Sequence, residues 1–258
     1  MNPLVSIIIV NWNAKEDLKE CLGSLSTIDY LNYEIILVDN GSTDGSVSLV
    51  RKQFPEVIIV ESDKNLGFAE GNNLGYQKSK GEYILFLNND TIVTRDFLRE
   101  LVNFIKGKKD VAVIQPKILF HRPGTTAHHK INSIASFLLD SGFLYHLDYG
   151  KKETKKVLPY EIFSAYGACF LARRNVIDKV GLFDPDYFAY FEETDFCHRL
   201  WLAGYKVMIL PDVFIYHKGE KTAQELSLTF IQYHSFKNRI FSFFKGGFFL
   251  HKLAEKPI

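Results

Sequence analysis

VSIIIVNWN, residues 5–13, is a run of apolar, mostly β-branched side chains that ends in polar ones. Three more runs of strand length follow, at Glu34–Val38, Val57–Val60 and Tyr83–Leu87. Continuous apolar runs of this kind are typical of parallel strands that are buried on both faces of a sheet. Segments of helical period lie among them, and the clearest are Lys15–Leu25 and Phe97–Ile105. The first half of the sequence therefore predicts an α/β fold, with an open, mostly parallel sheet flanked by helices.

Polar residues follow three of these predicted strands, at Asn11–Asn13, Asp39–Ser46 and Asn88–Thr91. Ligands of open α/β sheets bind outside the carboxyl ends of the strands, so these residues are the first candidates for a binding site. Asp39 ends its strand in VDNGSTDGS, where a carboxylate can accept hydrogen bonds from ribose hydroxyls or from ring N–H groups. The same segment is also a good turn and helix cap, and this alternative explains it without a ligand.

Asp90 lies in the segment FLNNDT, residues 86–91, and is the metal candidate at this edge of the sheet. Mg²⁺ and Mn²⁺ need only one or two carboxylates when water and phosphate oxygens fill the remaining positions. His217 follows another apolar run and is a second candidate, either as a metal ligand or as a donor to phosphate. An Asx turn explains Asp90 equally well, and a single histidine is more often structural.

GLFDPDYFAYFEETDFCH, residues 181–198, holds five carboxylates and no lysine or arginine. Acids crowded beside aromatic side chains repel one another and lose hydration, which raises their pKa values into the range that suits a general base. Glu192, Glu193 and Asp195 are the candidates. The alternative is a solvated acidic loop before a helix, where the helix dipole favours acids and Asp195 pairs with Arg199.

The composition is that of an ordinary globular protein, with 258 residues of which 47% are apolar and 24% charged. A formal net charge of +1 gives no electrostatic footprint for nucleic acid, so no nucleic-acid partner is expected. The three cysteines have neither metal-binding nor disulfide spacing and predict reduced core thiols in a cytosolic protein. We expect no signal peptide, and the apolar stretch Ile240–Leu250 is too short to span a membrane.

The second half of the sequence predicts a less regular chain. Residues 121–159 show little periodicity and indicate a mobile loop that acts as a lid over a substrate. Strands are expected at Ala168–Ala172 and Lys206–Leu210, and a helix at Glu193–Ala203. Helical spacing returns across Leu226–Phe244, where basic residues are interleaved with aromatic ones.

Seven segments occur in one order within residues 5–219: VSIIIVNWN, ILVDNGSTDGS, NLGFAEGNNLG, FLNND, GACFLARR, GLFDPDYFAYFEETDFCHRLWLAGY and PDVFIYHKG. In this combination the sequence resembles the family 2 glycosyltransferases, and among them the polysaccharide rhamnosyltransferases. The resemblance implies a GT-A fold with a central mixed sheet over residues 1–222. It implies a nucleotide-binding half at 1–115, an acceptor half at 116–222 and a basic, aromatic helical tail at 223–258.

The resemblance also implies a nucleotide-sugar site. It is formed by residues at the strand ends and in the loops beside them: Asn11, Asn13, Asp39, Asn65, Gly67, Asn88, Asn89, Asp90 and Gly167. The DxD-type metal motif of the family falls on residues 88–90, where only the last acid is present. Asp90 is therefore expected to carry Mg²⁺ or Mn²⁺.

The catalytic base of the family usually lies in a Glu-Asp pair, which is matched here by Glu192 and Glu193. Glu193 is the expected base, and Glu192 or Asp195 are the alternatives. The base would remove a proton from an acceptor hydroxyl, which attacks the anomeric carbon with inversion while the metal ion stabilises the departing diphosphate.

The implied donor is a nucleotide-diphosphate sugar, linked to UDP or dTDP, with dTDP-rhamnose as the specific expectation. The implied acceptor is a saccharide or a lipid-linked saccharide in cell-surface polysaccharide synthesis. Two other functions stay open. One is a catalytically inactive nucleotide-sugar-binding relative, and the other is a sugar nucleotidyltransferase, although the sequence lacks the basic, glycine-rich loop that a triphosphate requires.

The C-terminal stretch QYHSFKNRIFSFFK resembles the tail of relatives that act on lipid-linked saccharides. It predicts a cytoplasmic protein that contacts the inner face of the cell membrane through Phe241, Phe243, Phe244 and Phe248. Packing of these aromatic side chains on the protein core is the alternative.

Overall fold

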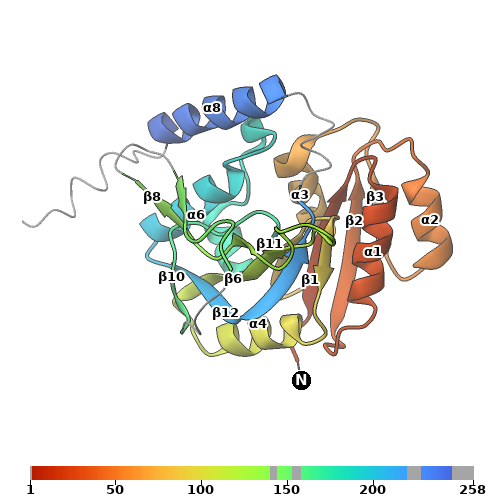
Figure 1. The fold of residues 1–258 in the computed structure, drawn as a ribbon, viewed down its shortest axis with the longest axis horizontal. Helices are drawn as coiled ribbons and strands as arrows, with labels where there is room; N and C mark the ends of the chain where they lie inside the picture. The colour runs from red at the N-terminus through yellow and green to blue at the C-terminus, as the bar shows by residue number, and fades with distance from the viewer. Residues whose placement is uncertain (1, 140–143, 153–157, 220–227, 246–258) are drawn as a thin grey trace, which may run out of the picture.

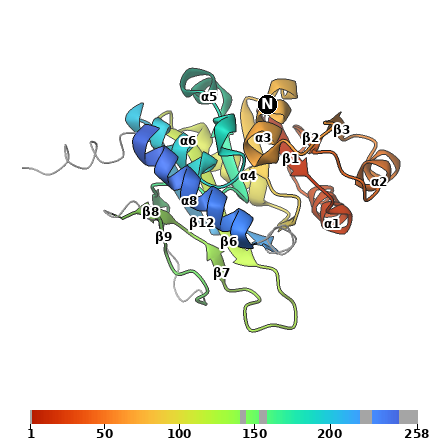
Figure 2. The same ribbon diagram turned by 90° about the horizontal axis from the view of Figure 1, so that it is seen from above.

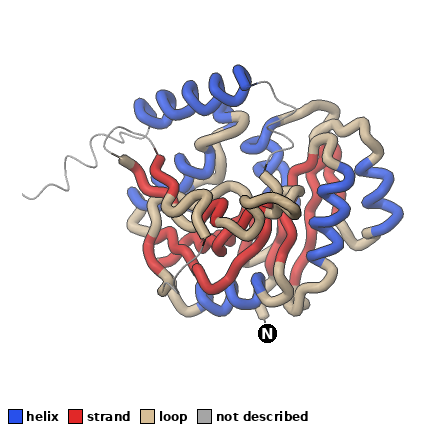
Figure 3. The backbone as a smooth tube through the Cα atoms, in the orientation of Figure 1, coloured by secondary structure: helices blue, strands red, loops and turns tan. Residues whose placement is uncertain are grey.

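The computed structural model describes residues 2–139, 144–152, 158–219 and 228–245 (Figure 1). The strands of its large sheet are β1 (Val5–Asn11), β2 (Tyr33–Asp39), β3 (Ile58–Glu61), β4 (Tyr83–Leu87), β5 (Thr91–Val93), β6 (Val111–Phe120), β7 (Ile131–Ser133), β10 (Tyr160–Glu161), β11 (Cys169–Arg173) and β12 (Lys206–His217). Eight of them lie in the order β10-β12-β6-β11-β4-β1-β2-β3, while β5 pairs with β12 and β7 with β6. The strands form a middle layer with helices on both sides (Figure 3).

Strands β1 to β4 form the parallel half of the sheet, as the apolar runs predict. Ile7 and Ile9 of β1 point into one hydrophobic core and Ile8 into the other, so both faces of the strand are buried. Two layers of helices cover these faces. Helices α1 (Lys15–Leu25), α2 (Ser46–Gln53) and α4 (Phe97–Lys106) contribute to the first core, and α3 (Gly67–Lys78), α5 (Arg174–Val180) and α6 (Glu192–Leu202) to the second.

Strand β11 makes the sheet mixed, because it runs antiparallel between β4 and β6. Cys169, at its start, pairs with Leu87, at the end of β4. The residues before β11 therefore lie at the carboxyl edge of the parallel strands. Strand β12 runs parallel to β6 and brings His217 to the same region.

Strand β6 corrects the expectation from the sequence, which includes no strand over these residues. Its ten residues are all buried although it contains Gln115, Pro116 and Lys117. A proline cannot donate to a sheet ladder and usually argues against a central strand. Here the pairing with β12 shifts register between Leu210 and Phe214, directly opposite this proline. The irregularity lets the strand continue past it.

The segment 121–159 is a second correction. The sequence predicts an irregular loop, but the structure shows β7 and a hairpin of β8 (Ser136–Leu138) with β9 (Leu144–His146). These strands are only three residues long, so they carry too little periodicity to be recognised. Residues 140–143 and 153–157 lie outside the described part.

The predicted C-terminal helix corresponds to α8 (Leu228–Lys245). It crosses the molecule on the side of α6, as Figure 2 shows. The remaining residues of the predicted tail, 223–227 and 246–258, lie outside the described part. Among the helices that the structure describes, none combines the length and the apolar character that crossing a membrane requires.

Candidate active site

Asn11 and Asp39 end β1 and β2 side by side, as register partners. The Asn11 side-chain amide donates to Asp39 Oδ1 at 3.3 Å, to Ser42 Oγ at 3.2 Å and to Ser46 Oγ at 3.1 Å. Its carbonyl oxygen accepts from the Asn89 amide at 2.8 Å. Both Asn11 and Asp39 are buried. They therefore tie the strand ends together beneath the surface that a ligand would contact.

Asn13 has a different place, in the loop after β1. Its side-chain oxygen accepts from the backbone N–H of Thr43 at 2.8 Å, and its own N–H donates to Ser42 Oγ at 3.0 Å. The backbone of Asn13 is left-handed, with φ 49°, which asparagine tolerates better than most residues. These bonds fix the loops after β1 and β2 against each other.

Gly67 begins α3 with a left-handed backbone, φ 78°. A Cβ atom there would collide with the carbonyl oxygen of Phe188, so the position requires glycine for space as well as for conformation. The same carbonyl accepts from the N–H groups of Phe68 at 2.7 Å and Ala69 at 3.1 Å. Asn65 Oδ1 accepts from Gly67 N at 2.8 Å. The start of α3 is thus capped by a residue from a distant loop.

Asp90 faces His217 across the end of β12. The distance from Asp90 Oδ1 to His217 Nε2 is 3.1 Å, and Asp90 Oδ2 accepts from Gly219 N at 3.0 Å. Burial alone would raise the pKa of Asp90, but the adjacent His217 and the Gly219 N–H outweigh it and hold that pKa below its usual value. His217 Nδ1 lies 2.8 Å from Asn132 Oδ1, which can only accept, so the proton belongs on Nδ1. Nε2, on the other side of the ring, is therefore the nitrogen that faces Asp90.

This pair fits a divalent ion. A carboxylate that stays ionised and an imidazole nitrogen oriented by a third residue are suitable ligands. The described residues contain no group of three or more histidine, cysteine or acidic side chains that could hold a metal. An ion at this place would therefore take its remaining ligands from water or from a substrate.

Glu192 and Glu193 occupy the first turn of α6. Glu192 is buried, and neither Glu192 Oε2 nor Glu193 Oε2 has a hydrogen-bond partner within the described residues. Burial raises the pKa of Glu193 to about 7, although the N–H groups around it work in the opposite direction. Burial and the neighbouring Glu193 raise the pKa of Glu192 well above its usual value. Two carboxyl groups that hold their protons this strongly are candidates for proton transfer at neutral pH.

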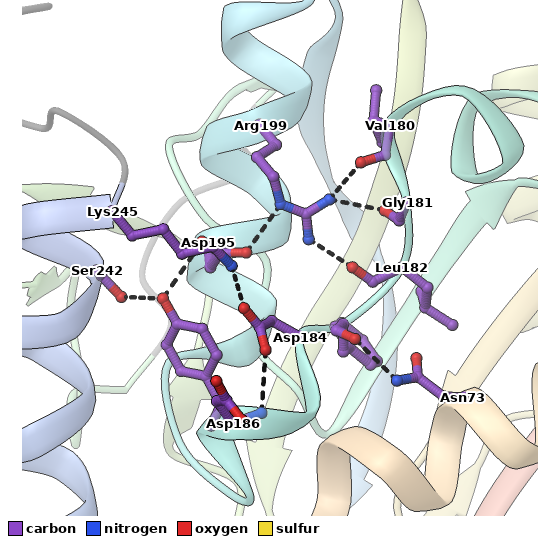
Figure 4. A network of polar contacts seen from close by, with 12 residues as sticks. Asn73, Val180, Gly181, Leu182, Asp184, Asp186, Asp195, Arg199, Ser242 and Lys245 are labelled. Atoms are coloured by element: carbon purple, nitrogen blue, oxygen red, sulfur yellow. Dashed lines mark hydrogen bonds and ion pairs between the residues drawn. The ribbon is translucent and has the colours of Figure 1, made fainter.

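Asp195 is oriented differently. Its carboxylate accepts from Arg199 Nε at 2.8 Å and from the Tyr187 hydroxyl at 3.2 Å, and Lys245 Nζ lies 3.7 Å away. Figure 4 shows this ion-pair network between α6, α8 and the loop that holds Asp184. The pairing of Asp195 with Arg199 is the structural alternative that the sequence analysis left open. A carboxylate with three partners of this kind is poorly suited to accept a substrate proton.

One cavity of about 480 Å³ lies at the carboxyl edge of the sheet. Asp90 and His217 lie on its wall together with Glu192 and Glu193, so the metal candidates and the base candidates share one space. Of the residues predicted from the sequence, its lining contains Asn65, Gly67, Asn88, Asn89, Asp90, Gly167, Glu192, Glu193 and His217. It does not include Asn11, Asn13, Asp39 or Asp195.

Trp12 and Asn40 also line the cavity and lie within the candidate ranges 11–13 and 39–46. The other lining residues were not predicted: Val10, Phe68, Tyr166, Ala168, Phe188, Ala189, Tyr190, Gly219 and Phe230. Tyr166 immediately precedes Gly167, so proximity in sequence could have identified it. Phe230 comes from α8, and no local pattern connects it with the sheet edge. It reaches the cavity only because α8 packs over the loop before α6.

The family model described as glycosyl transferase family 2 matches residues 6–181. The chain belongs to this family. The match confirms the resemblance seen in the sequence, and this glycosyltransferase has the GT-A fold that was expected. The matched range ends before α6 and α8, so neither Glu192 and Glu193 nor the C-terminal helix lies within it.

Two curated relatives align with most of the glycosyltransferase. The low-salt glycan biosynthesis hexosyltransferase Agl10 of Haloferax volcanii is 27% identical over 241 residues, which are 91% of this chain and 74% of the relative. The rhamnosyltransferase WbbL of Escherichia coli is 29% identical over 231 residues, 83% of each chain.

Solved structures show the same fold at lower identity. A crystal structure of GalNAc-T7 with UDP, GalNAc and Mn²⁺ has a TM-score of 0.72 and 19% identity, over 83% of this chain and 44% of that one. The mannosyltransferase PcManGT from Pyrobaculum calidifontis, in complex with GDP-Man and Mn²⁺, has a TM-score of 0.65 and 20% identity, over 86% of this chain and 58% of that one. The glycosyltransferase thus spans about half the length of these solved chains.

Proposed function

We propose that this glycosyltransferase moves a sugar from a nucleotide-diphosphate sugar to a hydroxyl group of a saccharide or lipid-linked saccharide, with inversion at the anomeric carbon. The observation that carries the proposal is the shared cavity, with Glu193 on one wall and the Asp90–His217 pair on another. UDP- and dTDP-linked sugars are the proposed donors, and the rhamnosyltransferase relative favours dTDP-rhamnose among them. The proposed context is the synthesis of a cell-surface polysaccharide.

Glu193 is the proposed general base. Its carboxylate accepts the proton of the acceptor hydroxyl while the hydroxyl oxygen forms a bond to the anomeric carbon and the bond from that carbon to the diphosphate oxygen breaks. A single base and a direct attack invert the anomeric carbon. Glu192 is the alternative base, since it lies in the same cavity.

Asp90 and His217 are the residues proposed to hold Mg²⁺ or Mn²⁺. When bound, such an ion neutralises charge on the departing nucleotide diphosphate. Asn132 orients the imidazole, and the Gly219 N–H orients the carboxylate. Asn65, Gly67, Asn88, Asn89 and Gly167 are proposed to surround the donor, while Asn11, Asn13 and Asp39 support the strand ends beneath the nucleoside.

The two halves of the chain would then have distinct tasks. Strands β1, β2 and β4, within residues 1–115, supply the nucleotide side of the cavity. Residues 116–222 supply Gly167, the two glutamates and His217, and so carry the acceptor side.

The donor can be identified by calorimetric titration with UDP, dTDP and GDP, with and without Mn²⁺ or Mg²⁺, followed by a transfer assay with the matching sugars. We expect metal-dependent binding of one nucleotide and transfer of its sugar. Binding without any transfer would support the inactive relative instead. Pyrophosphate release from a nucleoside triphosphate and a sugar phosphate would support the nucleotidyltransferase.

The pH profile of kcat/KM provides a further prediction. Glu193 must be deprotonated to act as a base, and its pKa is raised to about 7. We therefore expect kcat/KM to fall about tenfold per pH unit below pH 7 and to level off above it. Glu193 ionises first and its charge raises the pKa of Glu192, so Glu192 stays protonated in this range and Glu192→Gln should leave the limb near pH 7. A limb near pH 4.5 in the unmodified protein would contradict the assignment of a buried base.

We also propose contact with the inner face of the cell membrane through α8, where only Phe244 of the residues that the sequence suggested is retained. Phe241 packs against Tyr187, with ring centroids 5.2 Å apart, so it faces the protein. Phe248 and the side chain of Phe243 lie outside the described part. The exposed apolar side chains of α8 are between 42% and 79% exposed, and they share one face of the helix: Tyr233, Phe236, Ile240 and Phe244.

Vesicle flotation tests this membrane contact. Phe236→Ser combined with Phe244→Ser should reduce the fraction bound to anionic vesicles at least about fivefold, because both rings lose their burial in the interface. Leu31→Ser is the matched control, since Leu31 is the most exposed large apolar residue in the described part and lies outside α8. Equal flotation of all three proteins would overturn the proposal.

A further inference from the structure

Asn238 of α8 holds a loop of the active site from behind. Its side-chain NH₂ group donates to three backbone carbonyls, those of Tyr187 at 2.7 Å, Ala189 at 2.8 Å and Tyr190 at 2.7 Å. The residue is 0% exposed. Three carbonyls that converge on one buried amide indicate a specific attachment, because buried polar groups are costly unless they are paired.

The loop that Asn238 holds has an unfavourable backbone. Phe188, Tyr190 and Phe191 have φ values of 59°, 71° and 74°, in the left-handed region that side chains other than glycine rarely adopt. Such conformations cost on the order of 1–3 kcal/mol each and persist only where surrounding contacts enforce them. Phe191 is the last residue before α6, so this backbone determines the position of the first turn of α6, which holds Glu192 and Glu193.

Several other contacts from α8 reach the same loop. The Ser242 hydroxyl lies 2.6 Å from the Tyr187 hydroxyl, and Lys237 Nζ donates to the Asp186 carbonyl at 2.9 Å. Lys245 forms an ion pair with Asp184 (Figure 4). Asn238 differs from Ser242, Lys237 and Lys245 because it makes three hydrogen bonds to the backbone. Their acceptors are the carbonyls of residues 187, 189 and 190, which are either left-handed or next to a left-handed residue.

The loop contributes to both sides of the cavity. Phe188, Ala189 and Tyr190 line it, and the Phe188 carbonyl caps the start of α3 at Phe68 and Ala69. A displacement of the loop would therefore move the start of α6, with its glutamates, relative to the sheet edge.

We propose that Asn238 is a positioning residue for the transfer reaction: by holding three carbonyls of the 187–190 backbone, it fixes the start of α6 and thereby the place of Glu193 in the cavity. This inference rests on the proposed function. Asn238 does not touch the cavity, and its action passes through the backbone. Only its NH₂ group is used, since Asn238 Oδ1 has no hydrogen-bond partner within the described residues.

The test uses two variants of Asn238 and two controls. Asn238→Ala removes the donor, and Asn238→Asp keeps the shape but turns an oxygen toward three carbonyls, so it should be the more harmful. Gln232→Ala changes an exposed residue of the same helix. Val102→Ala truncates a buried side chain of α4, on the other face of the sheet, and controls for a general loss of stability.

For Asn238→Ala we expect kcat per folded molecule to fall about 10–100-fold, as expected when a catalytic group is misplaced. The Kd of the nucleotide, measured by calorimetry, should change less than about threefold, because the ends of β1 and β2 are untouched. Hydrogen exchange should become faster in 187–193 and at Phe68 and Ala69. Both controls should keep the kcat of the unmodified protein, and neither should accelerate exchange selectively in these segments.

Unchanged kcat in Asn238→Ala, beside a Glu193→Gln variant that has lost activity, would overturn the inference and leave the proposed function intact. The inference would also be overturned if Asn238→Ala and Val102→Ala, at equal melting temperature, lost kcat to the same extent. If the unmodified protein transferred no sugar, the proposed function would fail, and the exchange data would still test the attachment. If Asn238→Ala does not fold, the same measurements are made on Ser242→Ala. We then expect kcat to fall about threefold, and an unchanged kcat would overturn the inference.

Discussion

Glu193→Gln is expected to lower kcat by about 10²–10⁴-fold, the range that general bases contribute. Glutamine preserves the size of the side chain but cannot accept the proton of the acceptor hydroxyl. The Kd of the donor nucleotide should stay unchanged, because the carboxylate acts on the acceptor. Glu192→Gln is the matched comparison and should retain most of the activity. If Glu192→Gln lost activity and Glu193→Gln kept it, the base would be Glu192.

Glu193→Gln should also make the protein more stable above pH 7. The pKa of Glu193 in the folded protein, about 7, lies above the ordinary value of 4.5, so the unfolded chain releases this proton first. Stability therefore falls as the pH rises from about 4.5 to 7, and this loss is complete above pH 7. Removing the ionisable group should raise the free energy of unfolding at pH 8 by on the order of 1–3 kcal/mol. Chemical denaturation at pH 5 and pH 8 measures the difference.

Asp90→Asn is expected to abolish metal-dependent nucleotide binding and to lower kcat at least about 10²-fold. The amide keeps the volume of the carboxylate but removes the charge that a divalent ion requires, and it leaves His217 without its anionic neighbour. Calorimetry with and without Mn²⁺ measures the loss of binding.

Asp212→Asn is the control for Asp90→Asn, because it makes the same chemical change at an exposed position of β12. It should behave like the unmodified protein. Full metal-dependent binding by Asp90→Asn would show that the ion is held elsewhere, and the role of His217 would then have to be reassigned.

The parallel half of the sheet was predictable because β1, β2 and β4 are buried on both faces and so have continuous apolar sequences. Strand β6 escaped prediction because Gln115 interrupts its apolar run. Tertiary hydrogen bonds are what allow this polar side chain to be buried in the strand. Its side chain donates to Ser133 Oγ at 3.2 Å and accepts from Tyr166 N at 2.7 Å. Neither partner is close in sequence.

The candidate site was predictable where it follows strand ends, as with Asp90. Asp195 shows the limit. Its nearness to Glu193 suggests a shared role, yet two residues are only about half a helical turn, so its carboxylate lies on another face, among Arg199, Tyr187 and Lys245. The residues that orient the site, Asn132 and Asn238, have no local signal at all, because each acts on a segment far away in sequence.

The anomeric configuration of the product is the sharpest test of the proposed transfer with inversion. Transfer of the identified donor sugar can be followed by NMR from its first turnovers, with the anomeric coupling constant reporting the configuration of the new bond. We expect the product to have the opposite configuration to the donor, and we expect Glu193→Gln to form no product. A product that retains the configuration of the donor would contradict the single-base mechanism.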